Sequence, residues 1–282
     1  MIKRTGKTKA IYGIVFVALL LYSLTLILPF LVVIFNSFKS FREYMFELFA
    51  FPKELIVGGN MFQNYVNLFE EYDMISMVIN TLILTVGGIV VGTLSPAIMA
   101  YILAKFKFKF NTVIYYLAVV FMMMPSIGAT VATLKFFYQT NLINTHFGVL
   151  CLYAAPFNSY FFILLAYFKG LSPTYAEAAY IDGANEFTIF FKIVLPISKS
   201  GLFSISLLVG MNCWNDYFNP YMYMPDVSTL STGLQEMSLN VYGADILKLF
   251  AAMVCMTIPV LIVFFLNGNR IIENVAAGGI KE

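Results

Sequence analysis

Long apolar runs, separated by shorter polar stretches, set the pattern of this 282-residue chain. A helix of about 20 apolar residues is long enough to cross the ~30 Å hydrocarbon core of a bilayer. The fifth run is interrupted by several polar residues, so hydropathy alone supports it least. The pattern predicts an all-α, polytopic membrane protein with six transmembrane helices, at roughly 12–35, 76–104, 112–138, 147–168, 201–224 and 246–267.

The distribution of Lys and Arg predicts how these spans are oriented. With the N-terminus in the cytoplasm, twelve of the 17 basic residues fall on the cytoplasmic side, as the positive-inside rule requires. The apolar run that ends at Phe35 is too long for a signal peptide. Both termini are therefore expected in the cytoplasm. We expect one membrane domain over 1–282, divided into a first span (10–35), an external segment (36–75), spans two to four (76–168), a cytoplasmic loop (169–200), spans five and six (201–267) and a cytoplasmic tail (268–282).

The composition agrees with a membrane protein and argues against other classes of protein. The chain is 60% hydrophobic and 11% charged, whereas soluble domains carry about 25% charged residues. Its three cysteines lie in apolar runs without Cys-x-x-Cys spacing, so they are expected to be small buried residues. His146 is the only histidine, and a metal site needs several ligands, so no metal is expected. A net charge of +2 gives no reason to expect nucleic acid.

The largest polar segment outside the predicted spans runs from 36 to 73 and is mixed and acidic. We expect short helices on the outer surface there. Two interpretations stay open for them: contact with a binding protein, or a plain solvated face.

A second polar stretch, between the fourth and fifth predicted spans, has fixed spacing. Glu177 opens a Glu-Ala-Ala triplet, Gly183 follows after three residues, and Pro196 closes an Ile-Val-Leu-Pro run. Ser172 or Thr174 can cap a first helix. Gly183 can take the left-handed conformation that ends it. A second helix is predicted over about 185–195, ending before or at Pro196, with a stripe that packs on the protein's own spans: Phe187, Phe190, Phe191 and Val194.

This spacing closely resembles the EAA loop of ABC importer permeases, and the flanking Leu171-Ser172-Pro173 and Ile181-Asp182-Gly183 resemble the carbohydrate-importer branch. The resemblance implies a type I ABC importer permease fold, a multi-pass subunit of a prokaryotic plasma membrane, and a loop that docks on a cytoplasmic ATPase. It assigns ATPase docking to Glu177, Ala178, Ala179, Asp182 and Gly183, and packing within the loop to Ile193, Leu195 and Pro196.

Weaker resemblances extend it to nearly the whole chain. Asn80-Thr81 is similar to the family's start of the second span, and Ala100 to Phe106 to its end. The tail Asn269–Glu282 resembles the C-terminus of the second permease of maltose-type importers, although it ends Gly-Gly-Ile-Lys-Glu rather than Gly-Ala-Val-Lys-Gly.

The resemblance implies four partners: a homologous second permease, two cytoplasmic ABC ATPase subunits, an extracellular solute-binding protein, and membrane lipid. ATP and Mg are expected in the ATPase, because this chain has no Gly-x-x-x-x-Gly-Lys-Ser/Thr phosphate loop. No catalytic residue and no cofactor are expected in the chain itself.

The fifth predicted span carries a second constellation. Four polar residues lie at intervals of three, one and three, which places them on one helical face, with the only tryptophan beside it. An Asp at a helix centre in hydrocarbon costs about 2.5–3.5 kcal/mol, so such a face is expected toward a bundle interior or a water-filled path. Direct contact with a sugar and structural hydrogen bonding between helices are the alternatives. We assign the translocation path or gate to Asn212, Trp214, Asn215, Asp216 and Asn219.

The predicted function is therefore the permease subunit of an ATP-driven importer for a sugar or oligosaccharide. A permease for another solute, such as a polyamine or a phosphate ester, is one alternative. An ion-coupled secondary carrier is another, for which Asp216 is the one good candidate for a buried coupling residue. An intramembrane enzyme ranks lowest, because the sequence shows no paired catalytic carboxylates, zinc motif or Ser/His arrangement.

Overall fold

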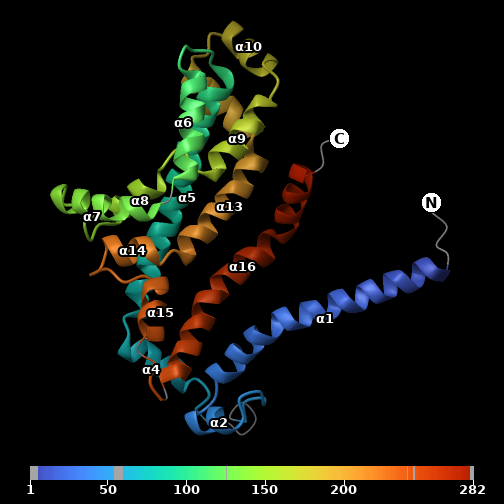
Figure 1. Cartoon of the computed structure of the whole chain (residues 1–282), viewed down its shortest axis with the longest axis vertical. Coiled ribbons are helices and arrows are strands. Elements are labelled where there is room, and N and C mark those ends of the chain that lie inside the picture. The colour runs from blue at the N-terminus through green and yellow to red at the C-terminus, as the bar shows by residue number, and fades with distance from the viewer. Residues whose placement is uncertain (1–5, 54–59, 125, 240, 244, 280–282) are drawn as a thin grey trace. The chain divides into compact units, whose positions relative to one another are not determined.

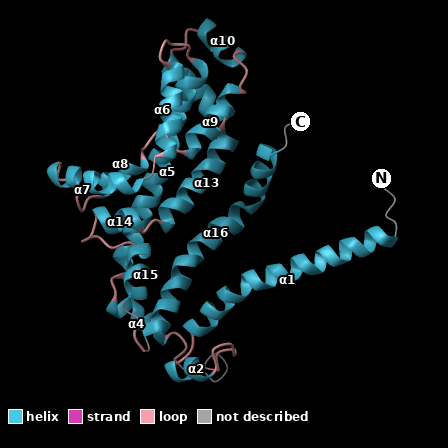
Figure 2. Ribbon diagram, in the orientation of Figure 1, coloured by secondary structure: helices cyan, strands magenta, loops and turns pink. Residues whose placement is uncertain are grey.

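The computed structural model describes residues 6–53, 60–124, 126–239, 241–243 and 245–279. Every regular element in this part of the chain is helical, as the sequence predicts (Figures 1 and 2). Two units separate: residues 1–74 with 234–259, and residues 75–233 with 260–282.

Within the described residues, three helices are long and apolar enough to cross a membrane. They are α1 (Gly6–Ser37), α5 (Met74–Lys105) and the Asp245–Gly268 part of α16 (Asp245–Gly279). A fourth forms if the pair Glu186–Ile197 and Lys199–Asn215, bent by 82°, is counted as one span. The remaining predicted spans are built from shorter pieces.

The predicted third and fourth spans are wrong as single helices. The third consists of α6 (Asn111–Met123), a 3-10 turn at Ser126–Ala129 and α7 (Thr130–Gln139). The fourth is divided into α8 (His146–Tyr153) and α9 (Ser159–Lys169). The break between α8 and α9 contains Ala155-Pro156, because proline disfavours helical conformation in the residue before it. Asn158 then begins α9 by accepting a bond from the Phe161 amide at 3.1 Å.

The first unit contains a tightly braced turn after α1, with α2 (Phe41–Phe46) and α4 (Gln63–Glu71) as the predicted short helices. Lys39 is only 1% exposed, and its Nζ donates to the carbonyl oxygens of Glu47 and Leu48 at 2.7 and 3.1 Å. Asn64 Nδ2 donates to the Ser37 and Lys39 carbonyl oxygens at 2.8 and 2.9 Å. These bonds satisfy backbone groups that the turn leaves unpaired.

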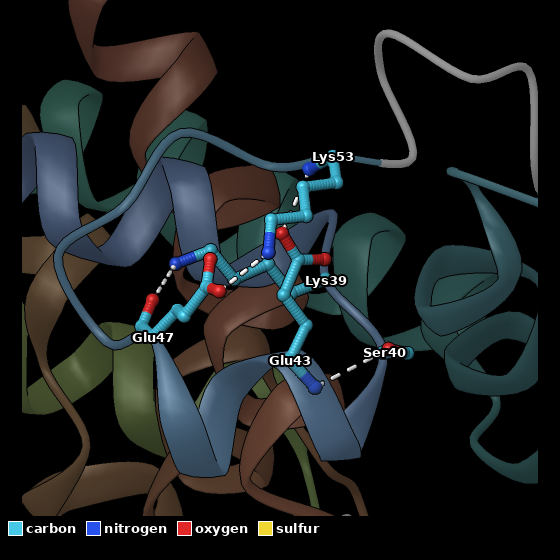
Figure 3. Close-up of polar contacts among 5 residues, drawn as sticks. All are labelled: Lys39, Ser40, Glu43, Glu47 and Lys53. Carbon is cyan, nitrogen blue, oxygen red and sulfur yellow. Dashed lines mark hydrogen bonds and ion pairs between the residues drawn. The ribbon is translucent and has the colours of Figure 1, made fainter.

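Charged side chains surround this turn (Figure 3). Burial lowers the pKa of Lys39, and the nearby carboxylates of Glu43 and Glu47 oppose that shift. Glu43 also accepts a bond from the Lys53 amide at 2.7 Å, and Glu47 forms an ion pair with the Lys53 ammonium. The turn is therefore held by several bonds to backbone groups, in addition to the aromatic contacts of Phe38 with Phe62 and Tyr65.

The second unit has its main core where α5, α9 and α13 (Lys199–Asn215) meet. Phe161 and Phe168 of α9 are fully buried there, beside Ala97 and Ala100 of α5. Small residues let the backbones approach closely, as is usual between membrane helices. A Cβ at Gly88 of α5 would lie only 2.5 Å from the Cys213 sulfur.

Candidate functional site

The segment that carries the Glu-Ala-Ala triplet, here the EAA segment (residues 172–197), folds as two helical pieces joined by a sharp turn. The first is α10 (Thr174–Ile181), and Gly183 follows with φ of +79°. Only glycine takes this left-handed conformation without steric cost, so the predicted left-handed turn at Gly183 is confirmed. The second piece starts with α11 (Glu186–Ile189), where Asn185 Oδ1 accepts a bond from the Thr188 amide at 2.8 Å.

The second piece continues as a five-residue π-helix at Phe190–Val194 and a last turn, α12 (Leu195–Ile197). The helix was expected to end before or at Pro196, but it runs through Pro196 to Ile197. Proline is tolerated there because it occupies the first turn of α12, where its missing N–H is not needed.

Two of the assigned EAA residues lie differently from their predicted roles. Ala179 is 6% exposed and packs in the core of the second unit, so its side chain does not face a partner. Pro196 is exposed, whereas Ile193 and Leu195 pack against that core. Ala176 also packs there, three residues before Ala179, which is the spacing of one helix face. The other assigned docking residues are exposed: Glu177, Ala178, Asp182 and Gly183.

Large apolar side chains extend this exposed face. Ile181 is 87% exposed and Phe187 is 77% exposed, while Phe191 is 49% exposed. The prediction that Phe187 and Phe191 pack on the protein's own spans is therefore wrong; only Phe190 and Val194 of that stripe are buried. Periodicity reports which residues share a face, but not whether another chain covers it. We call the exposed set the EAA surface: Glu177, Ala178, Ile181, Asp182, Gly183 and Phe187.

A hydrogen bond between side chains connects the two helical pieces of the EAA segment. The Tyr180 hydroxyl donates to the Glu186 carboxylate, which raises the pKa of Tyr180 to about 12. The bond joins α10, which carries Ile181, to α11, which carries Phe187, across the Gly183 turn.

The base of the EAA segment is tied to α5. The Tyr101 ring lies 5.0 Å from the Phe190 ring and 6.0 Å from the Phe168 ring, between centroids. Lys105 Nζ donates to the Leu171 carbonyl oxygen at 2.7 Å. A displacement of the EAA segment must therefore move α5 and α9 with it or break a buried aromatic cluster.

A polar cavity of about 290 Å³ lies elsewhere in the same unit. Asp216 sits at its wall, in the break between α13 and α14 (Phe218–Tyr223). Its carboxylate accepts bonds from the Tyr153 hydroxyl at 2.7 Å, and from the Asn219 amide nitrogen and side chain at 3.2 and 2.6 Å. All three partners are donors, so they suit an ionised carboxylate.

This geometry corrects the prediction of one continuous polar helix face. The helix ends at Asn215, and Asp216 has extended backbone with ψ of 109°. Asn212, Asp216 and Asn219 line the cavity. Asn215 instead donates to the Met211 carbonyl oxygen at 2.8 Å, and Trp214 is 7% exposed; neither lines the cavity.

Three tyrosine and asparagine residues that line the cavity were missed by the sequence interpretation. Tyr153 comes from α8, Asn158 caps α9, and Tyr160, on α9, accepts a bond from Asn212 Nδ2 at 2.5 Å. The signal available in the sequence was weak: two tyrosines and an asparagine in otherwise apolar stretches. Their convergence with α13 depends on the break between α8 and α9.

Comparison with known proteins identifies the family. The family model described as "Binding-protein-dependent transport system inner membrane component" matches residues 92–272, a range that contains the EAA segment and the polar cavity. The chain belongs to this family. It is accordingly a multi-pass permease of the inner membrane, a transport component rather than an enzyme.

Relatives of this permease are named as components of carbohydrate uptake or transport systems. It is 31% identical to the diacetylchitobiose uptake system permease protein NgcG of Streptomyces coelicolor, over 92% of this chain and 86% of that protein. It is 28% identical to the probable starch degradation products transport system permease protein AmyC of Thermoanaerobacterium thermosulfurigenes, over 96% and 97%.

A solved structure shares the fold of this permease. It is a chain from a bacterial ABC transporter involved in the import of the acidic polysaccharide alginate. The TM-score is 0.75 at 23% identity, covering 94% of this permease and 98% of that chain. The fold is therefore that of an ABC importer permease.

Proposed function

We propose that this permease is the transmembrane subunit of an ATP-driven ABC importer for a sugar or oligosaccharide, and that it forms half of the translocation path. The observation that carries the proposal is the attachment of the EAA segment to α5 through Tyr101 and Lys105. It gives an exposed surface a rigid connection to a membrane-spanning helix. The carbohydrate names of the relatives support the substrate class.

The partners follow from this assignment. A homologous second permease encloses the other half of the path, and two ABC ATPase subunits lie in the cytoplasm. A solute-binding protein delivers the substrate from outside, in keeping with the family's description. ATP and Mg belong to the ATPase, and this chain holds no cofactor.

The topology we propose has six crossings with both termini in the cytoplasm. The broken helices α6–α7 and α8–α9 then serve as crossings with interruptions, together with α13–α14. Irregular backbone is tolerated at membrane depth where protein or a water-filled cavity satisfies it. At the α13–α14 break, the Asn219 amide donates to the Asp216 carboxylate and the Ser231 hydroxyl donates to the Asp216 carbonyl oxygen, which is an arrangement of that kind.

In the transport cycle, closure of the ATPase displaces the EAA surface. Because the segment is fixed at its base, α5 and α9 move as well, and the path changes from inward-facing to outward-facing. Hydrolysis of ATP resets it. Glu177, Asp182 and Phe187 contact the ATPase, whereas Ala179, Ile193 and Leu195 transmit the force by their packing.

The test is co-purification of the complete complex, expressed with its partners in mild detergent, combined with uptake in proteoliposomes. Glu177→Lys should lose the ATPase and abolish uptake while membrane insertion is kept. Glu70→Lys, an exposed acidic residue of α4 in the other unit, is the matched control for charge reversal and should keep the ATPase. Retention of the ATPase by the Glu177 variant with normal uptake would contradict the docking role. Uptake that continues without the ATPase and collapses with an ion gradient would favour a secondary carrier.

A further inference from the structure

A long central part of the chain has no acidic residue. Between Asp73 and Glu177 the sequence contains no Asp or Glu, but it contains five lysines: Lys105, Lys107, Lys109, Lys135 and Lys169. Four of them gather at one end of the second unit, because α5 ends at Lys105 and α9 ends at Lys169. The Lys105 bond to the Leu171 carbonyl oxygen places both ends beside the base of the EAA segment.

A cavity of about 170 Å³ opens at this end, between α5, α6 and α9. Leu103 and Leu165 form its apolar side. Its polar side is formed by Thr112 and Tyr115 of α6 and by Lys169, whose Nζ lies 5.7 Å from the centre of the Tyr115 ring. A wall that is apolar on one side and cationic on the other suits an amphiphile.

The polar groups of this cavity are not used by the described part of the protein. Neither the Thr112 and Tyr115 hydroxyls nor the Lys169 ammonium has a hydrogen-bond or ion-pair partner among the described residues. Lys107 and Lys109, exposed in the connection to α6, also have no carboxylate partner there. Asn111, by contrast, is occupied: its Nδ2 donates to the Leu103 and Phe106 carbonyl oxygens, which fixes the turn.

We propose that this cavity binds the phosphate of an anionic phospholipid. A phospholipid phosphodiester carries one negative charge and oxygen atoms that accept charge-assisted bonds from an ammonium and hydroxyl groups. Basic pockets between membrane helices on the cytoplasmic side suit such headgroups. Leu103 and Leu165 contact the start of the acyl chains, Lys169 and Thr112 hold the phosphate, and Lys107 and Lys109 raise the local concentration of anionic lipid.

The site lies next to Leu171, where the EAA segment begins. A lipid held there anchors the end of α9 at the level of the headgroups. The assignment to the cytoplasmic leaflet rests on the proposed orientation, but the binding itself does not.

Native mass spectrometry of the complete transporter complex tests this proposal. The complex, stripped of lipid in detergent, is titrated with dioleoyl-phosphatidylglycerol, with dioleoyl-phosphatidylcholine and with inorganic phosphate. We expect one tightly bound phosphatidylglycerol that depends on this chain. Lys169→Gln combined with Thr112→Ala should weaken that binding by about tenfold, the effect of losing bonds to a charged group.

Two further variants keep the outcome interpretable. Lys169→Arg should retain the lipid, because it preserves the charge. Lys135→Gln, an exposed lysine of α7, should behave as the unaltered chain. An unchanged phosphatidylglycerol count in the Lys169/Thr112 variant would overturn the proposal. Displacement of the lipid by equimolar inorganic phosphate would also overturn it, because it would indicate a phosphate-ion site. None of these measurements of lipid binding depends on ATPase binding or on uptake. A negative result would therefore contradict the lipid site without contradicting the proposed function.

Discussion

The EAA surface and the polar cavity are both polar features of an apolar protein, but their polar groups are used in opposite ways. On the EAA surface, Glu177 and Asp182 are exposed and available to a partner. In the cavity, the Asp216 carboxylate already accepts bonds from Tyr153 and Asn219. The difference fits the proposed docking role of the EAA surface, whereas the polar groups of the cavity wall maintain a break in a helix. Four predictions test that difference.

The largest effect is expected at the turn of the EAA segment. Gly183→Pro should abolish uptake, because proline fixes φ near −65° whereas the turn needs +79°. Gly183→Ala should be milder, costing about 1–2 kcal/mol for a left-handed residue with a Cβ. Uptake and ATPase co-purification in proteoliposomes measure both. Equal uptake by the two variants and the unaltered chain would show that this turn does not set the docking geometry.

The second prediction concerns the break in the cavity wall. Asp216→Ala leaves the Tyr153 hydroxyl and the Asn219 side chain without their acceptor, so it should destabilise the permease by about 2 kcal/mol and lower uptake. ATPase binding should be unaffected. Thermal unfolding of the purified complex and uptake together check this. Tyr153→Phe, which removes one of these bonds, should show a smaller loss of stability; a larger loss than that of Asp216→Ala would refute the network.

The third prediction separates two asparagines on the same helix. Asn212→Ala should lower uptake, because Asn212 lines the cavity and donates to Tyr160. Asn215→Ala should have little effect, because its side chain bonds the Met211 carbonyl oxygen outside the cavity. Uptake rates at matched expression decide between them. A stronger defect for Asn215→Ala would restore the single polar face predicted from spacing.

The smallest effect is expected for Tyr180→Phe. The hydroxyl bond to Glu186 raises the Tyr180 pKa from 10.0 to about 12, so its stabilisation is fully present below pH 10 and is lost as the pH rises through about 12. The pair is exposed, and its contribution is about 0.5 kcal/mol or less. Ultraviolet titration of the tyrosines should lose one high-pKa group in the variant. Loss of a tyrosine that titrates near 10.0, with the high-pKa part of the curve unchanged, would show that the bond does not form.

Local chemistry explains which features could be predicted from the sequence. The all-α class follows from apolar runs, and the Gly183 turn follows from the one residue that takes positive φ without cost. That the Ala179 side chain faces the core could not be predicted. Alanines lie on both the buried and the exposed faces of this helix, and their hydrophobicity does not distinguish the faces. The exposure of Phe187 was missed for the opposite reason: its hydrophobicity is typical of a buried residue.

Breaks in helices were the main source of error. The interruption between α8 and α9 brings Tyr153 and Tyr160 to the cavity, and at the one after Asn215 the Asp216 carboxylate accepts the bond from Tyr153. Hydropathy averaged over a span cannot locate such breaks, because the residues on either side remain apolar. Pro156 marked one of them, yet a proline within a membrane helix also suits a kink that leaves the helix intact.

The π-helix at Phe190–Val194 sets how far the residues before it are rotated about the helix axis relative to the residues after it. Each residue of an α-helix advances the side chains by about 100° around the axis, so one deleted residue in this stretch would rotate Phe187 by that angle relative to the buried Val194. A one-residue insertion or deletion could therefore re-aim the whole EAA surface without altering any residue on it.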